Sequence, residues 1–263
     1  MDERIRKHAK ILVDWSTEIR KGDNVLISSS EESRELVIAL YEEIGKRGAI
    51  PTTSYSSDEA MRAFLKNYDE EFEAPDHLLA LNKETDVTIR INSDPNLMAM
   101  NDVPGETLAK ISKAWQPIQE ERLSKKWCLT QHPTNAQAQM ANMSLEKYKD
   151  FVYNAILIDW EELHEKQEIL SEKINKAKKV RIEGSETDIT MNIEGMIAEN
   201  SDGKNNMPSG EVFTAPIKNS VNGKISFDKP VIFQGREIEN VKLEFEDGEV
   251  VEYSAEKGGK GAY

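Results

Sequence analysis

Hydrophobic positions in the first third of the chain alternate between helical and strand-like spacing. From residue 5 to residue 19 the apolar side chains, with His8 among them, recur every three or four positions, which predicts a helix that ends at Gly22. Three short apolar runs predict buried strands, at residues 24–28, 49–55 and 87–91. Helices that begin at serines are expected between these strands. An alternation of strand and helix predicts an α/β domain with a mostly parallel sheet and right-handed crossovers.

The middle of the chain continues the same alternation. Pro104-Gly105-Glu106 opens a helix that extends toward Lys126, and Pro117 is expected to bend this helix. Residues 127–130 then form a predicted fourth strand. Ser144 begins a helix that we expect to continue as one long element through its apolar positions, at Trp160, Leu163, Leu170, Ile174 and Ala177.

Beyond this long helix the pattern becomes strand-like. Short alternating runs separated by turn residues predict strands at residues 180–182, 188–193, 212–213, 224–227, 231–233 and 241–245. The Asp247-Gly248 pair predicts a hairpin between residues 243–245 and 250–253. We therefore predict two domains: an α/β domain over residues 1–175, ending in the connecting helix, and the β-rich start of a catalytic domain over residues 176–263.

Charge and cysteine content narrow the class of protein. The 263 residues include 48 acidic and 34 basic side chains, a formal net charge of −14, which disfavours nucleic acid and anionic membranes as partners. Cys128 is the single cysteine, so the sequence has no disulfide framework, and a buried strand residue is the favoured interpretation for it. The first residues lack a signal-peptide run, and no segment has the apolar length of a membrane span. We expect a soluble, cytoplasmic protein.

The residues typical of nucleotide binding are missing. The turn after the first strand is Ser28-Ser29-Ser30-Glu31-Glu32, which has no glycine and would repel a phosphate. His132 follows the fourth strand, where α/β proteins place their sites, although a structural turn histidine is the favoured interpretation. For the other histidines we expect a packed His8, a surface His77 and a solvent-facing His164.

One motif, Asn206-Met207-Pro208-Ser209-Gly210-Glu211-Val212-Phe213-Thr214-Ala215-Pro216, combines turn chemistry with a carboxylate. Pro208-Ser209-Gly210 predicts a turn, Glu211 is expected to be the first residue of a short strand anchored by Val212 and Phe213, and Pro216 is expected to end it. An acid held at the start of a strand is consistent with a metal ligand, a general base or an ordinary turn residue, and the spacing alone does not choose among them.

This motif resembles the one found in the M29 family of metal-dependent aminopeptidases. The resemblance extends along the chain to the N-terminal residues 4–25, to Gln131-His132-Pro133-Thr134-Asn135-Ala136-Gln137-Ala138, to residues 148–152 and 187–190, and to the ending at residues 245–258. It implies a metallo-aminopeptidase that releases N-terminal residues from peptides, acts as a homodimer and uses two divalent ions, zinc or cobalt. It also implies that Glu211 is a metal ligand.

The same resemblance implies that the site is incomplete here. In the family, a second Glu, several His and Asp ligands and a catalytic Tyr come from later sequence, and this chain ends at Tyr263 before motifs of that kind. We therefore expect a chain truncated at its C-terminus that carries part of the site, with its catalytic residues unknown. The alternative is a non-catalytic family member that acts in dimerisation or peptide binding.

Overall fold

The computed structural model of the chain describes residues 1–233 and 236–257, and Gly258, the last residue of the ending that resembles the family, lies outside them. The chain forms two compact units. One comprises Met1–Trp160 with Ser201–Gly210, and the other comprises Glu161–Asn200 with Glu211–Tyr263. Residues 161–176 of the long helix thus belong to the second unit. The division into domains at residue 175 stays a prediction.

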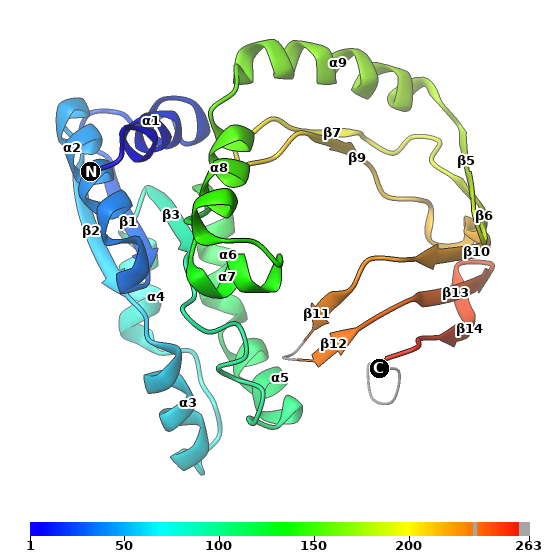
Figure 1. Cartoon of the computed structure of the whole chain (residues 1–263), viewed down its shortest axis with the longest axis horizontal. Coiled ribbons are helices and arrows are strands. Elements are labelled where there is room, and N and C mark those ends of the chain that lie inside the picture. The colour runs from blue at the N-terminus through cyan, green and yellow to red at the C-terminus, as the bar shows by residue number, and fades with distance from the viewer. Residues whose placement is uncertain (234–235, 258–263) are drawn as a thin grey trace. The chain divides into compact units, whose positions relative to one another are not determined.

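The first unit is built on a parallel five-stranded sheet with the order β2-β1-β3-β4-β8, of which β2, β1 and β3 are labelled in Figure 1. Its strands are β1 (Asn24–Ser29), β2 (Ile50–Tyr55), β3 (Val87–Asn92), β4 (Lys126–Gln131) and β8 (Asn206–Met207). The four strands predicted from the apolar runs are confirmed, and so is the α/β class. The fifth strand, β8, was not predicted; it pairs Leu129 with Asn206 and Thr130 with Met207.

Helices connect and flank these strands. They are α1 (Glu3–Ile11), α2 (Arg34–Arg47), α3 (Asp58–Asn67), α4 (Asp76–Lys83), α5 (Gly105–Ala114), α6 (Gln116–Leu123), α7 (Asn135–Met140) and α8 (Leu145–Ile156). The first helix passes into a π-helical turn, η1 (Leu12–Ser16), and a 3-10 turn, η2 (Glu31–Ser33), precedes α2. The apolar faces of α1 and α2 close over the sheet, and Leu12, Leu40, Ile44, Ile27 and Ile89 are fully buried.

Two predicted helices are each divided in two. Pro117 does not bend a continuous helix: the chain breaks at Trp115, and Pro117 lies in the first turn of α6, where its missing N–H is tolerated. The helix from Ser144 likewise ends at Ile156, and α9 (Trp160–Lys176) begins after a short break. Of the helices within residues 1–233 and 236–257, none is long and apolar enough to cross a bilayer.

The second unit consists of α9 and antiparallel strands. Its five-stranded sheet has the order β14-β13-β10-β6-β5, formed by β5 (Lys179–Gly184), β6 (Thr187–Asn192), β10 (Asn222–Phe227), β13 (Val241–Glu246) and β14 (Glu249–Ser254). The predicted hairpin at Asp247-Gly248 is confirmed by the pairing of β13 with β14. A 3-10 turn, η3 (Lys218–Ser220), precedes β10, and β11 (Val231–Phe233) pairs with β12 (Arg236–Ile238).

The buried face of α9 is partly polar: of the apolar positions predicted for this face, Trp160 is buried and Leu163 and Ile174 are half-buried, but Leu170 is not. Gln167 and Ser171 are 6% and 4% exposed, whereas the predicted core residue Leu170 is 48% exposed and Ile169 is 61% exposed. Two polar side chains of the helix bond to backbone groups of the second unit: Asn175 accepts from the Ala198 N–H at 2.8 Å, and Gln167 donates to the Glu211 oxygen at 2.9 Å. The Ser171 hydroxyl has no partner among the described residues. The helix therefore packs through hydrogen bonds as well as through apolar side chains.

Candidate functional site

Glu211 is the first residue of β9 (Glu211–Phe213), as the turn chemistry predicts. The strand pairs with β7 (Glu199–Ser201), and the two form the narrow ribbon beside α9 in Figure 1. The Glu211 side chain is exposed, and its carboxylate has no hydrogen-bond or ion-pair partner among the described residues. Phe213 is 51% exposed, so the expectation that it anchors the strand is wrong. The carboxylate is thus exposed and takes no part in the hydrogen bonds that the described residues make inside the fold.

The turn before Glu211 is closed by short polar contacts. Gly210 has φ of 124°, which non-glycine residues rarely adopt, and its N–H donates to the Ser201 oxygen at 3.0 Å. The hydroxyls of Ser201 and Ser209 lie 2.6 Å apart. The predicted turn at residues 208–210 is therefore confirmed, and the glycine is required by its backbone angle.

The start of the motif is buried in the sheet of the first unit. Met207 is 1% exposed, and its carbonyl oxygen accepts a hydrogen bond from the Thr130 hydroxyl at 2.8 Å. Because the Thr130 hydroxyl donates its hydrogen to Met207, it acts as the acceptor toward His8, whose Nε2–H donates to it, also at 2.8 Å. His8 is fully buried, as predicted, and its Nδ1 finds no partner among residues 1–233 and 236–257.

His132 is 8% exposed, its imidazole Nδ1 has no partner among the described residues, and the interpretation as a structural turn histidine stays a prediction. The backbone N–H of His132 donates to the Asn92 oxygen at 2.8 Å, and the next residues form a capping box between Thr134 and Gln137 that starts α7. Burial lowers the pKa of His132 to about 4, and burial with the neighbouring His132 lowers the pKa of His8 to about 3. Both imidazoles are neutral at physiological pH.

The remaining histidines lie on helices. His77 is exposed on α4, as expected. His164 does not simply face water: it is half-buried on α9, and Asn200 lies 3.3 Å from its Nδ1 and donates to its backbone oxygen at the same distance. Cys128 is a buried strand residue, as predicted, and burial raises the pKa of its thiol to about 12, so the thiol is unreactive in the folded chain.

Comparisons with known proteins decide the family. The family model described as thermophilic metalloprotease (M29) matches residues 1–261. The chain is a member of the M29 family. Aminopeptidase AmpS of Bacillus subtilis (strain 168) is 26% identical and is matched over 97% of this chain and 71% of its own length, and aminopeptidase PepS of Streptococcus thermophilus is 28% identical over 98% and 71%. The structure of wild-type AmpT from Thermus thermophilus matches with a TM-score of 0.80 at 25% identity, covering 97% of this chain and 72% of that chain.

M29 is a metalloprotease family, and its relatives are named aminopeptidases, so the chain belongs to a family of peptidases. The donor set here does not make a metal site by itself. Among the residues that the structure describes, no three His, Cys, Asp or Glu side chains gather closely enough to hold an ion. A catalytic zinc-type ion takes about three protein ligands, and Glu211 offers one carboxylate.

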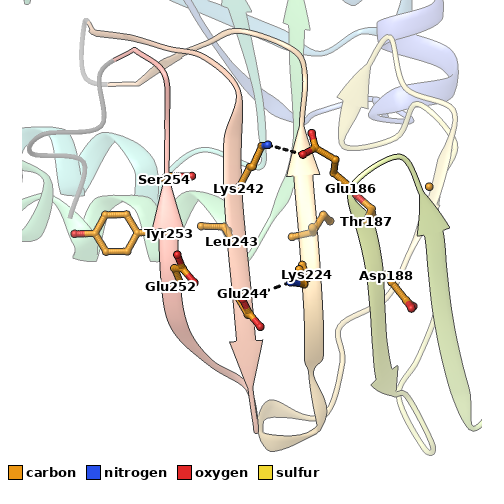
Figure 2. A pocket seen from close by; sticks show the side chains of 12 residues that line it. Glu186, Thr187, Asp188, Lys224, Lys242, Leu243, Glu244, Glu252, Tyr253 and Ser254 are labelled. Carbon is orange, nitrogen blue, oxygen red and sulfur yellow. Dashed lines mark hydrogen bonds and ion pairs between the residues drawn. The ribbon is translucent and has the colours of Figure 1, made fainter.

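Two of the hollows in the described part of the chain are lined by many charged side chains, and neither contains Glu211. The first has a volume of about 590 Å³ and lies on one face of the five-stranded sheet of the second unit. Lys242 pairs with Glu186 at 2.6 Å and Lys224 approaches Glu244 at 4.0 Å (Figure 2). Asp188 pairs with Arg181 at 2.8 Å, and Glu252 has no ion-pair partner among the described residues, so acidic side chains predominate in the lining.

The second hollow, of about 440 Å³, lies in the first unit at the carboxyl ends of β1, β2 and β3. Five carboxylates line it, from Glu31, Glu32, Asp58, Glu59 and Asp94. Burial and the nearby Asp94 raise the pKa of Asp58. Phosphate groups would be repelled here, in keeping with the absence of a nucleotide-binding turn in the sequence.

Proposed function

We propose that this chain functions as an M29 metallo-aminopeptidase, which releases N-terminal residues from peptides with a divalent ion, zinc or cobalt. Glu211 would be one ligand of that ion. The observation that carries this proposal is the placement of Glu211, an exposed carboxylate without a described partner, at the start of a strand whose preceding turn and backbone are fixed by hydrogen bonds. A carboxylate on a fixed backbone is the form in which proteins present metal ligands.

The remaining ligands of the site would come from polypeptide outside the described residues. When bound, the ions polarise the scissile carbonyl and lower the pKa of an attacking water. Within this proposal residues 176–263 begin the catalytic domain and residues 1–175 form a supporting domain. We propose further that the protein acts as a homodimer in the cytoplasm.

Complementation tests the proposal. The part of Thermus thermophilus AmpT that this chain does not match is expressed as a separate polypeptide and mixed with the chain in the presence of cobalt or zinc, and hydrolysis of an aminoacyl-anilide is followed. Turnover that requires both polypeptides and is lost in Glu211→Gln supports the role of Glu211. Glu199→Gln, on the paired strand β7, is the matched control and should retain turnover. Equal turnover in Glu211→Gln would contradict the proposal.

The second candidate is a non-catalytic family member that binds peptides or dimerises. The observation that favours it is β14, an edge strand whose residues are all exposed and which can pair with another extended backbone. Saturable binding of an unstructured peptide in the absence of metal, unchanged by Glu211→Gln and without cleavage under complementation, would select this candidate.

A further inference from the structure

The polar face of α9 makes a series of hydrogen bonds to the strands that carry Glu211. Along one side of the helix the polar residues fall at positions three or four apart, which places them in one row: His164, Gln167, Glu168, Ser171 and Asn175. Asn200 of β7 donates to the Glu168 carboxylate at 2.7 Å and to the His164 backbone oxygen at 3.3 Å. Gln167 donates from Nε2 to the backbone oxygen of Glu211 at 2.9 Å.

The ribbon formed by β7 and β9 needs such contacts. Each strand has three residues and pairs with the other as a separate two-stranded sheet. Isolated two-stranded ribbons are marginally stable, so their position depends on what they pack against. Of the hydrogen bonds between α9 and the ribbon, the one donated by Gln167 is accepted by Glu211 itself.

We propose that Gln167 is a positioning residue, whose side-chain N–H fixes the backbone of Glu211 and thereby the direction in which its carboxylate leaves β9. This inference rests on the proposed role of Glu211 as a ligand. Gln167 acts through the backbone and touches neither substrate nor ion, so its role is to orient a group that does.

The burial of Gln167 indicates that its amide is needed as a hydrogen-bond donor and not only to fill space. The side chain is 6% exposed, and its Oε1 has no partner among the described residues. A long polar side chain buried with an unpaired acceptor is unfavourable for packing alone, since an apolar residue of the same length would avoid that loss. What an apolar residue cannot supply is the donor to Glu211.

Three substitutions separate donation from packing. Gln167→Met keeps the length and removes the donor, and Gln167→Asn keeps the amide but shortens its reach. Gln167→Glu has no donor when ionised and regains an O–H donor when protonated, which burial beside a carbonyl oxygen should favour above the ordinary carboxyl range. The carbonyl ¹³C resonance of Glu211 and amide hydrogen exchange across residues 199–213 report the bond directly.

We expect Gln167→Met and Gln167→Asn to shift the Glu211 carbonyl resonance and to speed exchange in the ribbon about five- to tenfold, while α9 stays helical. Gln167→Glu, when ionised at pH 8, should perturb the ribbon at least as much as Gln167→Met, since its carboxylate repels the Glu211 oxygen, and it should return toward wild type as the pH falls to 5. Glu165→Gln, an exposed substitution on the same helix, controls for general effects of acid. The proposal is overturned if the resonance and exchange are unchanged, if Gln167→Glu shows no recovery in acid, or if the loss of protection spreads over the whole of α9.

These readouts require neither metal nor turnover. If these measurements contradict the role of Gln167, the role of Glu211 as a ligand is still tested by the complementation experiment. If complementation contradicts the role of Glu211, the effect of Gln167 on the backbone of β9 can still be measured.

Discussion

His8 and Thr130, 122 residues apart in the chain, are joined by a hydrogen bond of 2.8 Å in the core of the first unit, and the Thr130 hydroxyl in turn donates a hydrogen bond to the Met207 carbonyl oxygen. These two hydrogen bonds, here called the relay, connect the first residues of the Glu211 motif to the parallel sheet. Its members are buried, so each unmade bond carries a full desolvation penalty.

Replacing Thr130 should therefore destabilise the protein. Thr130→Val conserves shape but leaves the His8 Nε2–H and the Met207 oxygen unpaired, and we expect a loss of about 1–3 kcal/mol in the free energy of unfolding. Urea denaturation measures it. Thr52→Val, at an exposed position on β2, is the matched control and should change stability little; an equal effect of the two substitutions would contradict the relay.

Acid should weaken the fold through the buried histidines. The folded pKa values, about 3 for His8 and about 4 for His132, lie below the ordinary value near 6.5. Between these limits the unfolded chain binds protons that the folded chain does not, so stability is highest above pH 6.5 and falls as the pH drops, by up to about 1.4 kcal/mol per pH unit for each histidine.

Urea midpoints measured between pH 7.5 and pH 5 test this dependence. His132→Gln should reduce the slope of stability against pH, and His77→Gln, at an exposed position, should leave the slope as it is. A stability that is flat over this range, or that rises on acidification, is the result that would disprove the assignment.

Gly203 should tolerate no side chain. Its φ is +89°, and a Cβ there would lie 2.7 Å from Met207 Cε and 2.8 Å from Trp160 Cε3. Gly195 has a similar φ of +80° with nothing within 4 Å, so Gly195→Ala incurs the backbone strain alone. We expect Gly203→Ala to lower the thermal midpoint beyond Gly195→Ala, by an additional loss of about 1–3 kcal/mol from overpacking. Equal thermal midpoints for the two variants would contradict this prediction, because they would show that Met207 and Trp160 move aside without a loss of stability.

The outer edge of β14 should promote self-association. Val251 and Tyr253 on this strand are 53% and 54% exposed, and an exposed apolar edge is a template for further strand pairing. Val251→Lys should shift sedimentation profiles toward smaller species, whereas Val231→Lys, equally exposed on β11, should not. Monodisperse monomers of the unaltered chain would contradict this prediction.

The sequence predicts the parallel sheet well because its strands are local apolar runs between helices of clear periodicity. It does not reveal β8, because two residues give no periodicity and Met207 pairs with a strand far away in the chain. The polar part of the buried face of α9 is also missed, since Gln167 and Ser171 are polar residues in a charged stretch, and the hydrogen bond that Gln167 donates joins it to Glu211, which is distant in the sequence. At the site, turn chemistry places Glu211 correctly, but the relay through His8 and Thr130 joins residues that no local pattern connects.

The central claim is that Glu211 is one ligand of a metal site that the described residues do not complete. The complementation experiment tests the ligand role of Glu211; equilibrium dialysis of the chain alone against cobalt, followed by an aminoacyl-anilide assay on the same sample, tests most directly that the site is incomplete. The account predicts weak binding and no turnover above that of cobalt in buffer, in the wild type and in Glu211→Gln alike. Tight binding with turnover that Glu211→Gln abolishes would show a complete site in this chain and would contradict the account.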